Sequence, residues 1–362
     1  MNNRLVLLLF IFTTILFAIS CTTSSVETSN EVKFEDCAGE NWIIPCQQIV
    51  NAVGKDDIPS IDNPKFTTAS DVSFLEDWEL VHGIKIGDKL KAYPNVILYY
   101  HEIVNDSING TPIAVTYCPL TGSGIAWNRT IGGQTTSFGV SGFIHKNNLI
   151  AYDRSTNSFW SQMKNQSIGG EFKSTTTETI QIVEMTWGAW RNAFPESQVL
   201  NTNTGFDRNY NQYLYGKDYS EDDERILFPI FNEDNRLKRK ELVHNVIDNL
   251  QAKTYPLSNF GDNFKVINDS FEATNLVVVG NSKINMAISF SRILENGTEL
   301  TFSSTDKKFP IVLEDQEGTK WNIFGEAVSG PRKGQELKQI QSYNAYWFAI
   351  ADFYPFPTIF KN

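Results

Sequence analysis

The chain has little charge of either sign and no basic cluster. Only 20% of its 362 residues are charged, and the formal net charge is −11. Because proteins that bind nucleic acid carry clustered Lys and Arg, an acidic chain without such a cluster is not expected to bind nucleic acid. The length and the hydrophobic content allow two domains of ordinary size with a large core.

Several catalytic signatures are also missing. The sequence contains no phosphate-binding loop, no dinucleotide-binding fingerprint and no Ser/His/Asp motif of a hydrolase. Gly122-Ser123-Gly124 is too short to predict a phosphate site. No cofactor can be identified from the sequence, and the chemistry left to consider rests on four cysteines and four histidines.

Long apolar runs are absent except at the N-terminus. Arg4 precedes an apolar stretch over residues 5–18, which is typical of a secretory signal. The following Ala18-Ile19-Ser20-Cys21 resembles a bacterial lipobox. We therefore expect residues 1–20 to be a lipoprotein signal peptide and Cys21 to carry lipid; ordinary signal cleavage or an uncleaved anchor are the alternatives.

The residues after Cys21 predict where the protein is anchored. Residues 21–36 are rich in Ser and Thr, which is typical of a flexible tether. No Asp follows Cys21 directly, as in lipoproteins sent to the outer membrane of a Gram-negative cell. We expect an exported protein whose partner is a membrane, reached through the lipid on Cys21.

Cysteine is scarce, and this scarcity sets one residue apart. If Cys21 carries lipid, three cysteines remain in an oxidising compartment. Cys37 and Cys46 are close in sequence and are predicted to form a disulfide. Cys118 is then the unpaired thiol, which is worth attention in an exported protein.

Two blocks of the sequence match each other. Leu80-Val81-His82 matches Leu242-Val243-His244, and Lys91-Ala92-Tyr93-Pro94 matches Lys253-Thr254-Tyr255-Pro256. Trp160 and Trp321, which we expect in the core, keep nearly the same offset. This regularity predicts an internal duplication, with two tandem homologous units over residues 72–175 and 234–335.

Each unit is predicted to be rich in strands, because β-branched and aromatic runs alternate with Gly, Asn, Asp and Pro. Residues 97–104 and 111–118 are among the expected strands. Short helices are predicted over residues 47–53, 187–194 and 344–353. The fold class is therefore β-rich α+β, with an N-terminal segment (37–71), a helix and spacer (176–233) and a C-terminal helix and tail (336–362).

The two units differ at positions that suggest a site in the first. Cys118 lies opposite Val279-Gly280, and His101 lies opposite Phe264. We expect Cys118 to be a reacting thiolate and His101 to lower its pKa or move its proton. Thr121 and the backbone N–H groups of Gly122 and Ser123 would hydrogen-bond the thiolate. His82 and His244 occur in both units and are interpreted as structural.

Further polar residues of the first unit are candidates for ligand binding. Asp153, Arg154 and Gln162 have no identical counterparts when Asp153 is aligned with Glu314. Asp106 and His145 are candidates for a third metal ligand, although a solvent-exposed loop histidine is the alternative for His145.

Several of these motifs resemble the Domain of Unknown Function 3179 family, over about residues 45–355. The motifs that carry the resemblance are Lys91-Ala92-Tyr93-Pro94, His101-Glu102-Ile103-Val104-Asn105-Asp106, Val115-Thr116-Tyr117-Cys118-Pro119-Leu120, Asn148-Leu149-Ile150, Tyr152-Asp153-Arg154 and Trp160-Ser161-Gln162. Many members carry Cys-x-x-Cys at this turn, and some are described as candidate selenoproteins, which implies thiol redox or metal chemistry. Thr121 replaces the second cysteine, so a two-cysteine exchange mechanism is not expected.

Three functions remain open. The first is monothiol redox chemistry at Cys118, with a small molecule or a protein thiol as the partner. The second is binding of Cu(I) or Zn(II) by Cys118 and His101. The third is a non-catalytic surface lipoprotein that binds a small molecule or glycan between its two units, for which the abundant Tyr and Trp are suitable.

Overall fold

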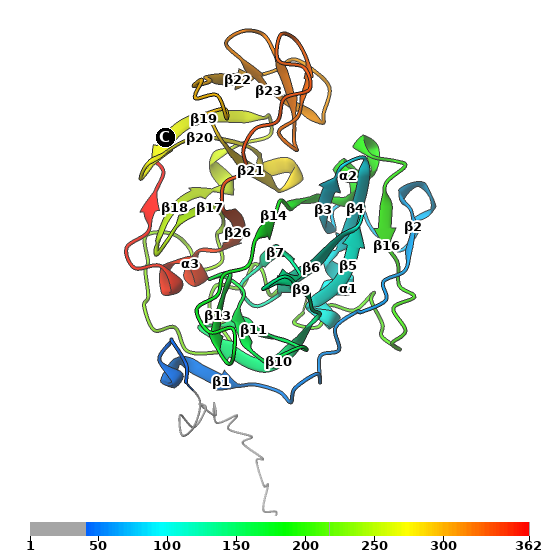
Figure 1. Ribbon diagram of the computed structural model, residues 1–362, viewed down its shortest axis with the longest axis vertical. Helices are drawn as coiled ribbons and strands as arrows, with labels where there is room; N and C mark the ends of the chain where they lie inside the picture. Colours follow the sequence, from blue (N-terminus) through cyan, green and yellow to red (C-terminus); the bar gives the residue numbers. More distant parts are fainter. Residues whose placement is uncertain (1–40, 217, 362) are drawn as a thin grey trace, which may run out of the picture. The chain divides into compact units, whose positions relative to one another are not determined.

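The computed structural model describes residues 41–216 and 218–361. This part of the chain consists mainly of β-strands with three short α-helices, which confirms the prediction of a strand-rich fold (Figure 1). No helix in the described ranges is long and apolar enough to cross a membrane. The predicted signal peptide, Cys21, the tether and Cys37 lie outside these ranges.

One sheet is built around the hairpin of β3 (Leu80–Ile86) and β4 (Lys89–Pro94). β15 (Val183–Thr186) pairs antiparallel with β3, β16 (Gln198–Leu200) pairs parallel with β4, and β2 (Phe66–Thr68) completes the edge. The helix α2 (Trp187–Ala193) connects β15 to β16. Gly83 of β3 lies against Trp190 of α2, and a Cβ there would come within 1.9 Å of the Trp190 ring.

A second sheet has the same order and directions of neighbouring strands. β17 (Leu242–Asp248) and β18 (Gln251–Pro256) form its hairpin, β26 (Ser342–Tyr346) pairs antiparallel with β17, and β27 (Thr358–Ile359) pairs parallel with β18. The helix α3 (Trp347–Phe353) connects β26 to β27, as α2 connects β15 to β16. Figure 1 shows β17, β18 and β26 side by side, next to α3.

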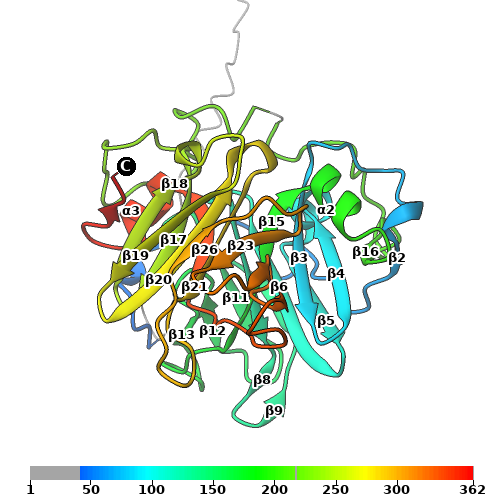
Figure 2. The ribbon, with the colours of Figure 1, turned by 90° about the horizontal axis from the view of Figure 1, so that it is seen from above.

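Two antiparallel sheets follow these hairpins in the chain. The first has the strand order β14-β7-β6-β5 and the second β19-β20-β21, whose strands Figure 2 shows side by side. Their strands are β5 (Ile103–Ile108), β6 (Thr111–Cys118), β7 (Ser123–Asn128), β14 (Thr179–Ile180), β19 (Lys265–Phe271), β20 (Thr274–Asn281) and β21 (Met286–Ser291). The turn from β6 to β7 contains the Cys118-Pro119-Leu120-Thr121 sequence.

Two further sheets have the orders β1-β10-β11-β12-β13 and β22-β23-β24-β25. Their strands are β1 (Ile49–Asn51), β10 (Phe138–His145), β11 (Asn148–Asp153), β12 (Phe159–Ser161), β13 (Gln166–Gly169), β22 (Phe302–Ser304), β23 (Ile311–Asp315), β24 (Lys320–Asn322) and β25 (Ala327–Ser329). A small ribbon of β8 (Thr130–Ile131) and β9 (Gln134–Thr135) stands beside them.

Three predicted elements differ from the structure. Residues 47–53 form no α-helix, since a 3-10 turn at Cys46–Gln48 leads directly into β1. The expected strand 97–104 is instead the helix α1 (Asn95–His101), which begins after Pro94 and ends at Glu102 with φ of +52°. The first residues of the predicted helix 344–353 belong to β26. Short apolar runs show no clear hydrophobic periodicity, so the sequence pattern cannot distinguish a strand from a helix there.

Two large apolar cores contain side chains from both halves of the chain. One of them joins Cys118 and Trp127 with Val243, Trp347 and residues of α3. The predicted core positions of Trp160 and Trp321 are confirmed, since both side chains are fully buried. The Cys118 turn therefore lies in a continuous apolar interior.

Candidate functional site

Cys118 is a buried residue at the end of β6, where no solvent reaches its side chain. Its thiol contacts the Asn147 carbonyl oxygen at 3.5 Å. Burial, and then the charge of Glu102, raise the pKa of the Cys118 thiol to about 11. Because the thiolate is the nucleophile, a thiol held protonated and enclosed is not arranged for redox chemistry.

The polar side chains beside Cys118 are occupied with one another. Thr121 and Ser123 share a hydroxyl hydrogen bond of 2.8 Å, and Ser123 donates to Gln162 Oε1 at 2.8 Å. Asn148 donates to Thr121, Ser123 and Gln162, and the Gln162 amide donates back to the Ser123 carbonyl oxygen. This closed and buried network fixes the turn, and three of its members are residues that we predicted to bind a thiolate or a ligand.

His101 does not hydrogen-bond Cys118. It is the last residue of α1, and its Nδ1 lies 2.7 Å from the Pro59 carbonyl oxygen while its Nε2 lies 2.6 Å from the Tyr210 hydroxyl. Burial lowers the pKa of His101. With both ring nitrogens occupied by other groups, the imidazole ties α1 to two loops instead of activating the thiol.

The remaining predicted ligand residues have partners of their own at separate places. Asp106 accepts from Lys91 and Tyr93, and Asp153 accepts from Trp160 and from the turn that follows it. Asp315 makes the same contact with Trp321 at 3.2 Å. The contact that matches that of Asp153 is thus made by Asp315, one residue after Glu314.

Arg154 and His145 also have contacts with residues outside the Cys118 turn. Arg154 pairs with Asp62 at 2.8 Å. His145 is buried, contrary to the exposed-loop alternative, and packs edge-on against Phe353. Within residues 41–216 and 218–361, no three His, Cys, Asp or Glu side chains are grouped so that they could hold a metal ion.

The two cysteines of the described residues differ in oxidation state. Cys46 is disulfide-bonded and Cys118 is free. Because these are the two cysteines of the described part, the partner of Cys46 lies outside it. The specific pairing with Cys37 stays a prediction.

The structure instead contains a cavity of about 490 Å³ lined by aromatic rings, which we call the tyrosine cavity. Its walls come from α1, β6, β15, β26 and the spacer around residues 213–221. The principal lining residues are Trp78, Glu79, Asn95, Tyr99, Tyr117, Gly122, Glu184, Tyr213, Tyr215, Tyr219, Lys240, Lys283, Asn285 and Tyr346. Gly122 is the one predicted site residue among them, and its lack of a Cβ leaves space for the Tyr346 ring.

The rings of the tyrosine cavity form a continuous series from the surface to the interior. Trp78, which is 58% exposed, stacks on Tyr213 with ring centroids 6.0 Å apart. Tyr213 contacts Tyr99 at 5.8 Å, and Tyr99 contacts Tyr117 at 5.7 Å. Tyr117 then lies 5.3 Å from the buried His82 ring. Such a wall offers apolar faces with hydroxyl groups at their edges.

Glu184 is a buried carboxyl group in the wall of the tyrosine cavity. It lies on β15 directly opposite His82 of β3. Asn285 donates to it at 2.9 Å and Asn344 at 3.3 Å, while His82 Nε2 is 3.6 Å away. Burial raises the pKa of Glu184 to about 7 and lowers the pKa of His82 to about 3. His82 is therefore uncharged at neutral pH, and Glu184 has no cationic partner there.

Asn95 is the second unusual polar group of this cavity. Its side chain is only 2% exposed, yet neither the amide nitrogen nor the amide oxygen has a hydrogen-bond partner among the described residues. A side-chain hydrogen bond with Asn95, too weak to meet ordinary hydrogen-bond geometry, lowers the pKa of the Glu184 carboxyl against the effect of burial. Buried amides are normally paired, so an unpaired one that lines a cavity indicates a group that a ligand could satisfy.

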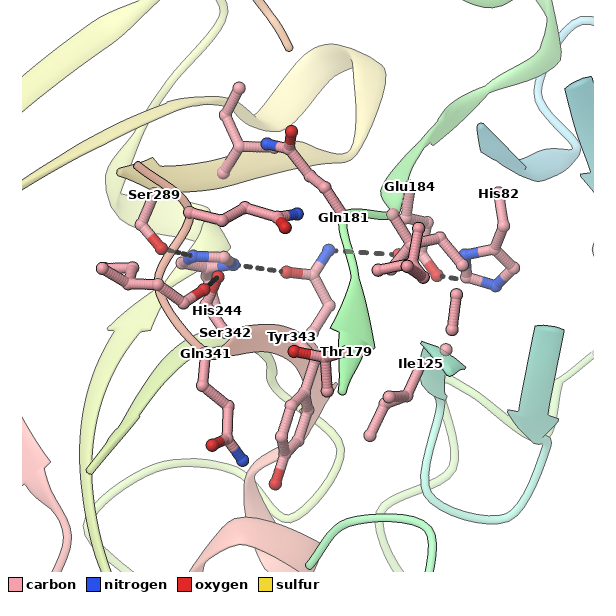
Figure 3. Close-up of a pocket in the computed structure, with 18 of the residues that line it drawn as sticks. His82, Ile125, Thr179, Gln181, Glu184, His244, Ser289, Gln341, Ser342 and Tyr343 are labelled. Atoms are coloured by element: carbon pink, nitrogen blue, oxygen red, sulfur yellow. Dashed lines mark hydrogen bonds and ion pairs between the residues drawn. The ribbon is translucent and has the colours of Figure 1, made fainter. Parts of the chain in front are cut away.

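Glu184 also borders a second, narrow cavity of about 40 Å³. Figure 3 shows Ser289 and His244 on one side of it and Glu184 and His82 on the other. A polar chain crosses this space: Ser289 to His244 Nε2 at 3.0 Å, His244 Nδ1 to Asn344 at 2.9 Å, and Asn344 to Glu184. The two histidines that we interpreted as structural are thus connected through Glu184 and Asn344.

The sequence predictions missed Glu184, Asn95 and the tyrosine wall. One signal was available for Glu184, a charged residue between Val183 and Met185 in an apolar stretch. The tyrosines gave no such signal, because they come from α1, β6, β26 and the spacer, which only the tertiary fold brings together.

Comparison with known proteins identifies the family alone. No curated protein and no solved structure matches the chain. The family model described as a protein of unknown function, DUF3179, matches residues 55–356. This range takes in the Cys118 turn, the tyrosine cavity and the β3–β4 and β17–β18 hairpins, so the chain belongs to the DUF3179 family.

Proposed function

We propose that the protein binds a small organic molecule in the tyrosine cavity. The observation that carries the proposal is Asn95, whose buried amide has both polar atoms unpaired at the wall of an aromatic cavity. Binding sites are typically concave and mostly apolar, with a few polar groups that orient the ligand. Glu184 and Asn285 supply such groups beside Asn95, and the tyrosine faces supply the apolar contact.

The other two functions have less support. Thiol redox chemistry requires an accessible thiolate of lowered pKa, whereas Cys118 is enclosed and its pKa is raised. Metal binding requires ligands that converge, whereas His101 and Cys118 hydrogen-bond different partners. We therefore prefer the binding function over either.

A binding screen tests the proposal. Thermal-shift measurements with a library of small metabolites should identify compounds that stabilise the wild-type protein, since a ligand that binds only the folded state raises its stability. Ser220→Trp should abolish these shifts by filling the cavity with an indole ring at an exposed lining position. The control Ser303→Trp places the same ring at an exposed position of β22 and should keep them. Hits that survive Ser220→Trp would contradict the proposal.

We also infer that the two β-hairpin units arose by internal duplication. The offsets of the sequence blocks support this inference, as does the repeated strand order. Paired contacts add support: Asn105 bridges both backbone groups of Phe138, and Asn268 does the same with Phe302. The second unit would then have become a partner that completes the cavity of the first.

Export as a lipoprotein remains our proposal for the location of this binding site. It rests on the lipobox-like sequence before Cys21 and on the Ser- and Thr-rich segment after it. A lipid on Cys21 would hold the binding domain at a bacterial membrane, in an environment that permits the disulfide of Cys46. Metabolic labelling with palmitate, compared between wild type and Cys21→Ser, tests this proposal.

A further inference from the structure

We propose that the ligand of the tyrosine cavity is an organic cation, an ammonium group carrying a hydrogen-bonding substituent, and that Glu184 is its counter-ion. This inference rests on the proposed binding function and names the chemical class of the ligand. It is drawn from the surroundings of Glu184 and from a cation that the cavity wall already holds.

The Glu184 carboxylate lacks a counter-ion among the described residues. Its contacts are the amides of Asn285 and Asn344, the ring of His82 and, more weakly, the amide of Asn95, and none of these groups carries a positive charge. The lining lysines have not neutralised it: no contact joins it to Lys283, and Lys240 donates instead to the carbonyl oxygens of Tyr219 and Arg225. A buried carboxylate without a paired charge is costly, and a bound cation would remove that cost.

Aromatic rings lie around the Glu184 carboxyl group. The charge of Glu184 raises the pKa of three tyrosines, Tyr99, Tyr117 and Tyr346, so all three lie within its electrostatic range. Each of these residues also lines the cavity. Tyrosine faces attract cations through the ring quadrupole, most strongly where water is excluded.

The ammonium group of Lys240 already lies on a ring of the tyrosine cavity. Lys240 Nζ is 3.3 Å from the centre of the Tyr219 ring, and the residue is 5% exposed. The acidic groups that support its charge are Asp222, Asp223 and Asp218, at the outer side of the spacer. The wall thus holds one cation at the Tyr219 ring, while the rings around Glu184 and its carboxylate hold none.

Asn95 indicates which substituent the ammonium group of the ligand carries. Its unpaired amide can both donate and accept a hydrogen bond. A hydroxyl or an amide attached to the ammonium group would satisfy it, whereas a bare alkylammonium ion would not. Amino alcohols and their quaternary derivatives have this combination of groups.

The proposal also sets a direction of pH dependence. The titratable and charged groups that face Glu184 or share its cavity are His82, His244, Tyr99, Tyr117, Tyr213, Tyr215, Tyr219, Tyr343, Tyr346, Glu79, Glu221, Lys240 and Lys283. Burial keeps the histidines uncharged and the tyrosines protonated near neutral pH. Burial also lowers the pKa of Lys240 to about 8, so this lysine keeps most of its charge at pH 7 and below. Over that range the Glu184 carboxyl group changes its charge, and the affinity should rise as Glu184 ionises.

The test compares choline with 3,3-dimethylbutan-1-ol, an uncharged molecule of the same shape, by isothermal titration of the full mature protein. Above the Glu184 pKa of about 7, choline should bind about tenfold tighter or more. The preference should disappear well below that pH and in Glu184→Gln. It should persist in Glu178→Gln, which removes the same charge at an exposed position outside the cavity.

Several outcomes would overturn the proposal. They are equal affinity for the two probes, a preference that survives Glu184→Gln, and absence of choline binding. The pH comparison uses the wild-type protein, so it tests the role of the Glu184 charge even if Glu184→Gln does not fold. If neutral compounds stabilise the protein and Ser220→Trp abolishes the effect, the binding cavity stands although its cationic specificity is refuted.

Discussion

Cys118 and Glu184 show that burial has different consequences for two acids in one interior. Burial raises the pKa of both groups, to about 11 for the thiol and to about 7 for the carboxyl. The thiol then stays protonated at every physiological pH, whereas the carboxyl group titrates within that range. The cysteine that is distinctive in the sequence is therefore poorly suited to act as a nucleophile, and the group whose charge responds to pH belongs to Glu184, which the sequence predictions did not include.

The thiol of Cys118 should be unreactive in the folded protein. We predict that a maleimide or an aromatic disulfide reagent does not label it in native protein at mildly alkaline pH, because the thiolate is rare and enclosed. Labelling should become rapid and stoichiometric after unfolding in guanidinium chloride. Fast labelling of the native protein would restore thiol chemistry as a candidate function.

Glu184→Gln should change how stability depends on pH. The folded-state pKa of about 7 lies above the ordinary value of 4.5, so the folded protein binds an extra proton between these values. Stability from this group is present below pH 4.5 and is lost as the pH rises through about 7, a change on the order of 3 kcal/mol at most. Glu184→Gln removes this loss, so the variant should become progressively more stable than wild type above pH 5.

Chemical denaturation of both proteins across that pH range measures the difference. A constant difference in the free energy of unfolding at all pH values would contradict the raised pKa. Burial lowers the pKa values of His82, His145 and His244, which act in the opposite direction below pH 6.5. His145 cancels in the comparison, whereas His82 and His244 are connected to Glu184, so the difference is read above pH 6.5.

At the scale of elements, local patterns predicted strands well and short helices poorly. The strand predicted over 111–118 and the helix predicted over 187–194 are both present, as β6 and α2. The helix α1 was not predicted, because Val96-Ile97-Leu98 has high strand propensity and is held in a helix by tertiary burial. That helix carries Asn95 and Tyr99, so the misassigned element is one that forms the cavity.

The bridging asparagines allow a matched test of the two units. Asn105 and Asn268 each donate to and accept from one backbone residue of a neighbouring sheet, but Asn105 is buried and Asn268 is exposed. Asn105→Ala should cost about 2–4 kcal/mol because it leaves buried groups unpaired, and Asn268→Ala about 1 kcal/mol or less. Urea unfolding of both variants measures the costs. Equal costs would show that burial does not distinguish the two bridges.

At the scale of the whole molecule, the first half of the chain and its C-terminal residues share a core and are not independent. Tyr354 donates to the Met163 carbonyl oxygen at 2.9 Å, and the Tyr346 N–H donates to the Thr121 carbonyl oxygen at 2.8 Å. The matching blocks predicted two units from the sequence. They did not predict the cavity, because its wall depends on how β15 and β26 meet and on where the spacer lies.

A fragment of residues 234–362 should therefore not fold by itself. Separation would expose α3, whose side chains are buried in a core that the fragment shares with Trp127 and Trp160. We predict a circular dichroism melt without a cooperative transition and strong binding of a hydrophobic dye. A sharp cooperative melt of the isolated fragment would contradict the shared core.

The most direct test of the central claim compares ligand binding by wild type, Cys118→Ala and Ser220→Trp. The affinity of any compound found in the thermal-shift screen would be measured by isothermal titration with all three proteins. We predict that Cys118→Ala binds like wild type and that Ser220→Trp does not bind, because the ligand occupies the tyrosine cavity. Loss of binding in Cys118→Ala, together with normal binding in Ser220→Trp, would place the function at the cysteine and contradict the claim.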